Sequence, residues 1–377
     1  VKLERLKIAD AEGQIDEYTS IGIPKINAKA GYTHYFDIPT QILPDFLSPA
    51  VYNILFEEDL LERRDLETAG GIPAQFGTSN ILDVGVELQT LIVDGSYFVG
   101  LQAQKLYRDL VAKQYDATLY GLKESISLAY LSVLNVDQNL GLLDNNISNL
   151  QKLYDETFEI YQAGFAEKLD ADRLKLSLQN LQTERDNLVR LREVAIYSLK
   201  FNMGYPMNQN IQLSDSFEDH VNKAQVEKIE LGDNESFYQQ RPEYAPLETA
   251  VELQDMNIRS IKMGYFPSLS GFASYGGQLQ RNDLFDSNDN DWFKTSLVGL
   301  QLNVPIFDGL EKRAKIQRAK ISKSQSEIQK SLFERQVDLQ VNANYLEYLN
   351  AKEKVKSTQE NLELAQEIYD VTQIKFK

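Results

Sequence analysis

The feature that most constrains this chain is that its two halves repeat each other. Val84-Gly85-Val86 corresponds to Val298-Gly299-Leu300, an offset of 214 residues (298 minus 84). The same offset pairs Leu88 with Leu302, Ile92 with Ile306, Asp94 with Asp308, Gly95 with Gly309, Ala129 with Ala343 and Ile160 with Ile374. A register held over so long a stretch indicates duplication of one structural unit.

The repeat also defines the order of elements in each half. A second anchor sets Pro24 opposite Pro267, an offset of 243 residues, so the first half carries 29 extra residues (243 minus 214) in a loop between about 37 and 81. Each half therefore reads as helix, strand, loop, strand, Asp-Gly and long helix. The glycine after Asp94 or Asp308 suits a sharp change from strand to helix, because glycine tolerates backbone angles that other residues avoid.

Two long stretches without proline predict long helices. Proline is absent from 74–205 and from 306–377, and a proline inside a helix costs about 3 kcal/mol. From Tyr115 onward, largely apolar residues recur at alternating steps of four and three, which is typical of a coiled-coil seam. The seam consists of Tyr115, Leu119, Leu122, Ile126, Ala129, Val133, Val136, Leu140, Leu143, Ile147, Leu150, Tyr154, Thr157 and Tyr161.

This seam predicts a helix over about 95–163, which is roughly 100 Å long at 1.5 Å per residue. A return helix over about 166–203 completes an antiparallel hairpin with its tip near 162–167. A third long helix is expected from about 309, and its later part carries the spacing Val355, Thr358, Leu362, Ala365, Tyr369, Thr372 and Phe376.

Four segments have the alternation of β-strands: 24–37, 82–91, 267–278 and 292–304. Leu82, Val84 and Val86 fall on one side of the second segment. The opposite side carries Asp83, Glu87 and Gln89, and the corresponding polar side of the fourth segment carries Gln301 and Asn303. These polar residues would face the lumen of a membrane barrel, or plain solvent if the sheet is an ordinary half-buried one, because both have the same period.

Strand number bears on assembly. Four strands cannot close around a lumen, whereas three chains would contribute twelve, and closure removes the open edges that hydrocarbon does not tolerate. Aromatic residues at the strand ends suit a membrane-interface belt, although they suit ordinary core anchors equally well. They are Tyr35, Phe36, Tyr265, Phe266, Trp292 and Phe293.

Composition excludes several classes of protein. The net charge is −17, which argues against nucleic-acid binding because that affinity comes from basic groups on phosphates. There is no cysteine, so thiol catalysis, cysteine-based zinc sites and disulfides are excluded. His34 and His220 are the only histidines and are far apart in the sequence, and no phosphate-binding GxxxxGK[ST] loop is present. We expect no enzyme activity and no cofactor.

At this point the sequence resembles the TolC family of outer-membrane efflux proteins. The segments that carry the resemblance run from Tyr265 to Gly276 and from Gly299 to Gly309, with the PIFDG motif as the most specific part. Two smaller motifs also match: Arg241-Pro242-Glu243, and Tyr161-Gln162-Ala163-Gly164 with Asp170 following. The match extends over nearly the whole chain.

The resemblance implies a mixed α and β fold. Three chains would form a twelve-stranded outer-membrane β-barrel, four strands per chain, continuous with a long coiled-coil α-helical barrel in the periplasm of a diderm bacterium. The first repeat would occupy 1–203, an equatorial segment 204–246, and the second repeat 247–377. From the repeat, we expect about 40 further residues, matching 164–203, to follow Lys377. The sequence begins within an expected helix, so we expect a mature or trimmed chain from which any targeting segment has been removed.

The resemblance also implies partners and sites. The homotrimer would be the passive exit duct of a tripartite efflux pump or type I secretion system. An inner-membrane RND or ABC transporter would deliver drugs, metals or proteins through a periplasmic adaptor, with outer-membrane lipid around the barrel. Adaptor contact is expected at the hairpin tip, at Tyr161, Gly164, Phe165 and Asp170. The barrel–helix junction is expected at Pro24, Asp94, Gly95, Pro267, Pro305, Asp308 and Gly309.

Each sharp expectation has a plainer alternative. Gly164 also suits a helix C-cap, and Asp170 suits an N-cap or first-turn carboxylate. For the chain as a whole, the alternative is a periplasmic coiled-coil adaptor or structural scaffold without a membrane barrel. The duplicated strand pair favours the channel, because a scaffold has no reason to repeat two alternating strands at the base of each long helix.

Overall fold

The computed structural model describes residues 1–43, 47–62, 71–217, 237–283 and 292–375. They form two compact units. The strand unit comprises Glu12–Lys105 and Leu253–Ser322, and the helical unit comprises Val1–Ala11, Leu106–Glu252 and Lys323–Lys377. Each unit gathers segments from both repeats, so its limits differ from the sequence divisions 1–203, 204–246 and 247–377. The sequence divisions follow the duplicated repeats, whereas the two units follow the contacts within the fold.

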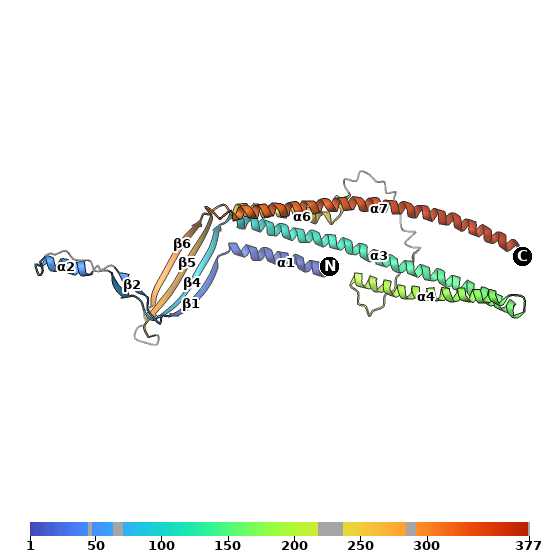
Figure 1. Ribbon diagram of the computed structural model, residues 1–377, viewed down its shortest axis with the longest axis horizontal. Coiled ribbons are helices and arrows are strands. Elements are labelled where there is room, and N and C mark those ends of the chain that lie inside the picture. Colours follow the sequence, from blue (N-terminus) through green and yellow to red (C-terminus); the bar gives the residue numbers. More distant parts are fainter. Residues whose placement is uncertain (44–46, 63–70, 218–236, 284–291, 376–377) are drawn as a thin grey trace. The chain divides into compact units, whose positions relative to one another are not determined.

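The strand unit is built on one four-stranded antiparallel sheet. Its order is β1 (Lys25–His34), β4 (Asn80–Val93), β5 (Ser268–Arg281) and β6 (Trp292–Asn303), as Figure 1 shows. Each half of the sequence contributes one neighbouring pair, and the β4–β5 ladder joins the two halves. Within the described residues, β1 and β6 each have a single neighbour in this sheet, so both are edges.

The loop expected between 37 and 81 contains structure that the sequence did not reveal. β2 (Thr40–Leu43) pairs with β3 (Ile72–Gln75), and α2 (Leu47–Glu57) lies between them in the chain. The prolines of this region favour a loop, but Pro49 falls in the first turn of α2, where proline is tolerated. Pro73 lies in a two-stranded ribbon, where both strands are edges and a missing donor costs little.

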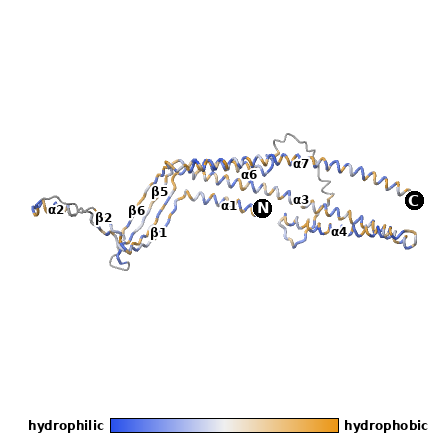
Figure 2. The backbone as a smooth tube through the Cα atoms, viewed as in Figure 1, coloured by the Kyte–Doolittle hydropathy of each residue, from blue (hydrophilic) through white to orange (hydrophobic). Residues whose placement is uncertain are grey.

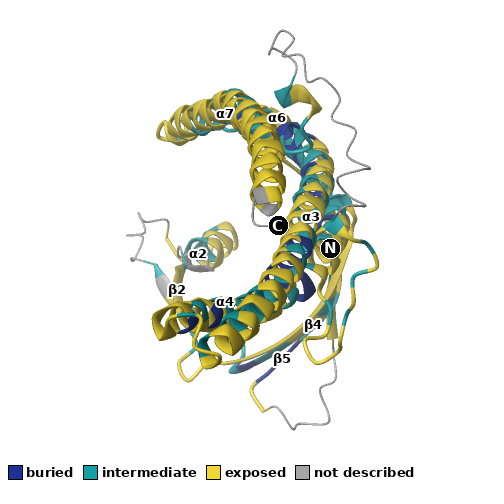
Figure 3. Ribbon diagram, turned by 90° about the vertical axis from the view of Figure 1, so that its right-hand side faces the viewer, coloured by how far each residue is buried: buried dark blue, intermediate teal, exposed yellow. Residues whose placement is uncertain are grey.

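The helical unit contains the expected hairpin. α3 (Gly95–Gln162) has 68 residues and begins in the strand unit, and α4 (Lys168–Met203) has 36. Every seam residue from Tyr115 to Tyr161 is buried or half-buried (Figure 3), which confirms the apolar register. The core of the hairpin is Ala129, Val133, Ala195 and Leu199. Figure 2 shows how polar and apolar residues intersperse along these helices.

Two further helices, α6 (Tyr244–Met263) and α7 (Glu311–Lys375), contact each other in this unit. The hydroxyl of Tyr244 donates to Glu334 at 3.1 Å, and the Lys330 ammonium lies 3.2 Å from Glu248 and 5.0 Å from the Tyr244 ring centre. The pKa of Lys330 is raised, chiefly because Tyr244 accepts a hydrogen bond from it.

The later part of α7 has a different character. The described residues of its predicted seam are exposed, with Val355 67%, Leu362 64% and Tyr369 64% exposed. Phe376, the last residue of that seam, lies outside the described residues. The remaining helix, α1 (Lys2–Thr19), is followed by a 3-10 turn at Ser20–Gly22 that leads to β1. None of the described helices is both long enough and apolar enough to cross a membrane.

Candidate functional site

The register of the sheet separates a polar face from an apolar one. Residues that sit opposite each other in an antiparallel pair project to the same side. On the polar side, Asp83 is opposite Gln278, Glu87 is opposite Ser274, and Gln89 is opposite Phe272. Gln301 is opposite Ser270 and Asn303 is opposite Ser268, so the five expected lumen residues share this face.

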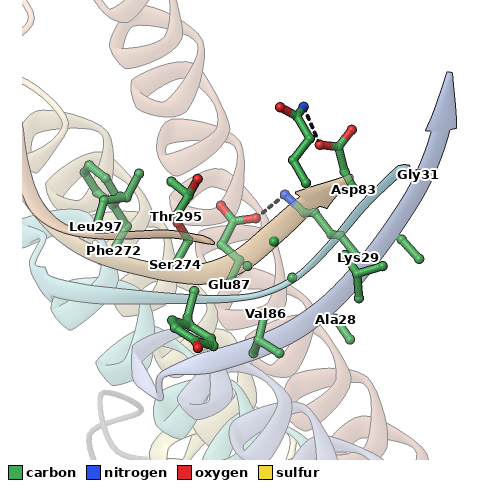
Figure 4. Close-up of a pocket in the computed structure, with 17 residues that line it drawn as sticks. Ala28, Lys29, Gly31, Asp83, Val86, Glu87, Phe272, Ser274, Thr295 and Leu297 are labelled. Atoms are coloured by element: carbon green, nitrogen blue, oxygen red, sulfur yellow. Dashed lines mark hydrogen bonds and ion pairs between the residues drawn. The ribbon is translucent and has the colours of Figure 1, made fainter. Parts of the chain in front are cut away.

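This polar face is hollowed by a recess of about 1000 Å³ (Figure 4). Lys29 of β1 forms an ion pair with Glu87 of β4, and Gln89 donates a hydrogen bond to the same carboxylate at 2.8 Å. Gln278 of β5 donates to Asp83 at 2.7 Å. The described strands place four charged residues on the polar face, which are Lys25, Lys29, Asp83 and Glu87. The two positive and two negative charges balance, so the face is polar without a net charge.

Sequence reasoning missed two features of the recess. The Lys29–Glu87 pair depends on the β1–β4 register, which brings together residues almost sixty positions apart. Phe272 and Leu297 are apolar yet rise from the polar side, as Figure 4 shows. Gly299 accounts for Phe272, since a β-carbon at Gly299 would lie 2.5 Å from the Phe272 ring. The sequence shows the position of Gly299, but it does not show that Phe272 is its partner on the neighbouring strand.

The opposite face is apolar and uncovered. Val84 and Val86 of β4 are each 47% exposed, and on β6 the exposed fraction is 85% at Val298, 71% at Leu300 and 63% at Leu302. Exposed apolar surface of this extent is typical of a site of interaction with protein or lipid.

The Asp-Gly pairs open both long helices, but the two glycines serve different purposes. Asp94 accepts hydrogen bonds from the backbone N–H groups of Ser96 at 2.7 Å and Tyr97 at 3.1 Å, and so caps α3. Gly309 has a φ of +64°, the left-handed geometry predicted for it. For Gly95 that reason is wrong, because it lies within α3 and has no such angle. Glycine is favoured at position 95 because a side chain there has little room: a β-carbon would lie 3.3 Å from Met263.

Asp308 performs the same capping role in the second half. Its carboxylate accepts the N–H groups of Leu310 and Lys312, each at 3.1 Å, and the Lys312 ammonium at 3.1 Å. The hydrogen bond from Lys312 lowers the pKa of Asp308, so this cap keeps its charge to a lower pH than an ordinary aspartate does. Pro24, Pro267 and Pro305 lie at strand ends, immediately before β1, immediately before β5, and two residues after β6.

The hairpin tip is closed by a glycine turn. Gly164 has a φ of +83°, and its N–H donates to Tyr161 while that of Phe165 donates to Ile160, which is the pattern of a Schellman C-cap. Phe165 is 86% exposed. Asp170 lies in the first turn of α4, 3.8 Å from Arg173. The geometry therefore supports the plainer roles of Gly164 and Asp170 and leaves Phe165 projecting.

No group of three or more His, Asp or Glu side chains within the described ranges is close enough to hold a metal ion. His34 contacts Asn80, with 2.7 Å between Nδ1 and Oδ1. His220 and the rest of 218–236, which is part of the expected equatorial segment, lie outside the described residues.

Comparison with known sequences finds outer membrane efflux proteins both as a family model and among individual relatives. The family model for outer membrane efflux proteins matches residues 235–377. The probable efflux pump outer membrane protein TtgC of Pseudomonas putida is 23% identical over 264 residues, which cover 68% of this chain and 53% of TtgC. The antibiotic efflux pump outer membrane protein ArpC of the same species matches equally well. The chain thus spans about half the length of the curated relatives it matches.

Solved structures share the fold. The CmeC outer membrane channel of Campylobacter jejuni aligns with a TM-score of 0.65 at 17% identity, covering 98% of this chain and 73% of CmeC. The open-state MtrE outer membrane channel of Neisseria gonorrhoeae aligns with a TM-score of 0.61 at 16% identity, covering 89% of this chain and 66% of MtrE.

Proposed function

We propose that this chain belongs to the TolC family of outer membrane efflux proteins, which the match of residues 235–377 to the family model and the efflux-pump relatives support. On that premise, three copies would form the outer-membrane exit duct of an efflux or secretion system. The four-stranded sheets would close into a twelve-stranded barrel, and the long helices would line a periplasmic tunnel. Transport would be passive, with energy supplied by an inner-membrane transporter of the RND or ABC class. The recess with Lys29 and Glu87 would then face the lumen.

One observation carries this proposal: the sheet has a bare apolar face, a polar face and two open edges. In water, aggregation would be promoted by the exposed side chains of Val298, Leu300 and Leu302 and by the unpaired edges β1 and β6. In a membrane, lipid would cover the apolar face, and neighbouring copies would pair the edges. The two faces match the alternation of a membrane barrel, apolar outward and polar inward.

The alternative, a periplasmic scaffold without a barrel, needs the apolar face to pack on the chain's own helices. Within the strand unit, Val298, Leu300 and Leu302 of that face are exposed, so no described helix of this unit covers them. We further propose that the hairpin tip meets a periplasmic adaptor, with Phe165 as the main contact. A bare aromatic side chain held by the Gly164 turn suits a protein partner better than solvent.

Labelling of single cysteines tests the proposed barrel directly. The chain has no cysteine of its own, so Leu297→Cys and Val298→Cys place one thiol on the polar face and its neighbour on the apolar face. In outer membranes, a charged, membrane-impermeant maleimide should modify the Leu297→Cys variant, because its thiol faces water. The Val298→Cys variant should be protected by lipid and become reactive only after denaturation.

Equal labelling of both cysteines in the native protein would contradict the barrel and favour the scaffold. Conductance of the purified protein in planar lipid bilayers gives an independent check, since an exit duct must pass ions and a scaffold must not.

A further inference from the structure

A groove of about 740 Å³ lies on the apolar side of the sheet, near the end where β6 begins. Its floor is made of small residues, with Gly277 on β5 and Ala28 and Ala30 on β1. Tyr275 and Trp292 border it, and the Trp292 ring lies over the floor: a β-carbon at Gly277 would be 3.0 Å from Cε3 of the indole. Its lining is largely apolar, which is the chemistry that an acyl chain requires.

Lys294 borders the same groove and is unusual for its position. It sits opposite Gly277, so its side chain shares the apolar face with Val298 and Leu300. A cation on a lipid-facing strand is unfavourable unless it reaches the interface or meets an anion. Among the described residues, no carboxylate pairs with Lys294.

Lys294 has no counter-charge among the strand residues of this face. It is the cation that β6 contributes to the face, and the described strand residues of the face include no Asp or Glu. Closure with a neighbouring copy would not change this. The β1 residues on the apolar face are Ile26, Ala28, Ala30, Tyr32 and His34, so a β1 strand pairing with β6 would bring no carboxylate to Lys294.

From this juxtaposition we propose that the groove binds a lipid with a phosphorylated anionic head group, with an acyl chain along Ala28, Ala30 and Gly277 and the head group on Lys294. The proposal rests on the barrel proposed above, which puts this end of the sheet at the outer membrane interface. The head group satisfies the cation, and the chain fills a trough that side chains leave open.

Trp292 is the only tryptophan of the chain and borders the groove, so its fluorescence reports occupancy. The purified full-length protein is placed in phosphatidylcholine vesicles with rising fractions of dibrominated phosphatidylglycerol or dibrominated phosphatidylcholine. Bromine quenches tryptophan on contact. We expect half-maximal quenching at a mole fraction roughly fivefold lower for the anionic lipid, the preference that one lysine near a charged head group supplies.

Three variants locate the effect. Lys294→Gln should abolish the preference for the anionic lipid while quenching by the zwitterionic lipid persists, and Lys294→Arg should retain the preference. Lys25→Gln is the control, because Lys25 lies on the polar face of the sheet, opposite Gln89, and does not line the groove. It should leave the preference unchanged.

The outcomes distinguish failure of the lipid site from failure of the barrel on which it rests. Equal quenching by both lipids, or a preference that survives Lys294→Gln, overturns the lipid site while the barrel stands. If neither lipid quenches Trp292 and Val298→Cys is freely labelled, the barrel itself is wrong. If Trp292 is unquenched but Val298→Cys is protected, a second copy fills the groove and the lipid site is overturned.

Discussion

Gly164 and Gly141 show how one residue type can have opposite effects in one helical hairpin. Gly164 holds a φ of +83° at the tip, where an alanine would strain the backbone by about 1 kcal/mol. Gly141 lies inside α3 with open space around the position of a β-carbon. An alanine there removes the flexibility of glycine and favours the helix by about 0.5–1 kcal/mol.

We therefore expect Gly164→Ala to speed hydrogen exchange at the tip, over 158–170, by about fivefold, and Gly141→Ala to slow exchange nearby in α3. Exchange measured by mass spectrometry on the full chain resolves both regions. Unchanged exchange at the tip of the Gly164→Ala variant would mean that the turn relaxes to another geometry.

Among the elements, the α3–α4 hairpin is fixed in register by charge as well as by its seam. Arg192 pairs with Asp137, and Arg185 pairs with Asp144 at 2.6 Å, so the two pairs lie seven residues apart on both helices. The hydrogen bond to Asp137 raises the pKa of Arg192. The Arg192–Asp137 pair is only partly exposed and contributes about 0.5 kcal/mol.

Exchanging the charges tests this role. Asp137→Arg should lower the unfolding temperature by placing two cations together, and adding Arg192→Asp should recover most of the loss. The original protein, Asp137→Arg, Arg192→Asp and the double variant form a double-mutant cycle, measured by circular dichroism in detergent. We expect a coupling energy of about 2 kcal/mol, because each single variant replaces an attraction of about 0.5 kcal/mol by a repulsion of similar size. Arg185→Met is a comparison in which one pair is lost without repulsion. If the double variant is no more stable than Asp137→Arg alone, the pair does not set the register.

The elements that could be predicted are those with a long, unbroken period. The seam from Tyr115 to Tyr161 identifies the buried side of α3 because every step in it is three or four. α2 was missed because its 11 residues hold only three turns and include Pro49. In the polar recess, Asp83 and Glu87 follow from alternation within one strand. Lys29, Phe272 and Leu297 depend on which strands are neighbours, and a single strand does not contain that information.

At the scale of the whole molecule, the proposed trimer in a membrane would cover apolar surfaces that the single chain leaves exposed. Apolar side chains lie bare along the sheet and along late α7, where Val355 and Leu362 are more than 60% exposed. A monomer of 43.0 kDa with such surfaces would aggregate in water. Lipid against the sheet and further helices against α7 would cover both surfaces. The purified protein should accordingly have three times the monomer mass in mild detergent.

Two neighbouring substitutions on β6 test which environment each face of the sheet meets. Leu300 is on the apolar face and Gln301 on the polar one. Arginine in place of Leu300 should cost about 2–4 kcal/mol if that position lies deep in hydrocarbon, so Leu300→Arg should sharply reduce the folded trimer recovered from outer membranes. Gln301→Arg should be tolerated, because a long cation fits a water-filled lumen. Quantifying trimer by native mass spectrometry after detergent extraction decides the matter. Equal yields would mean that the apolar face does not meet lipid, since solvent would accept arginine at both positions alike.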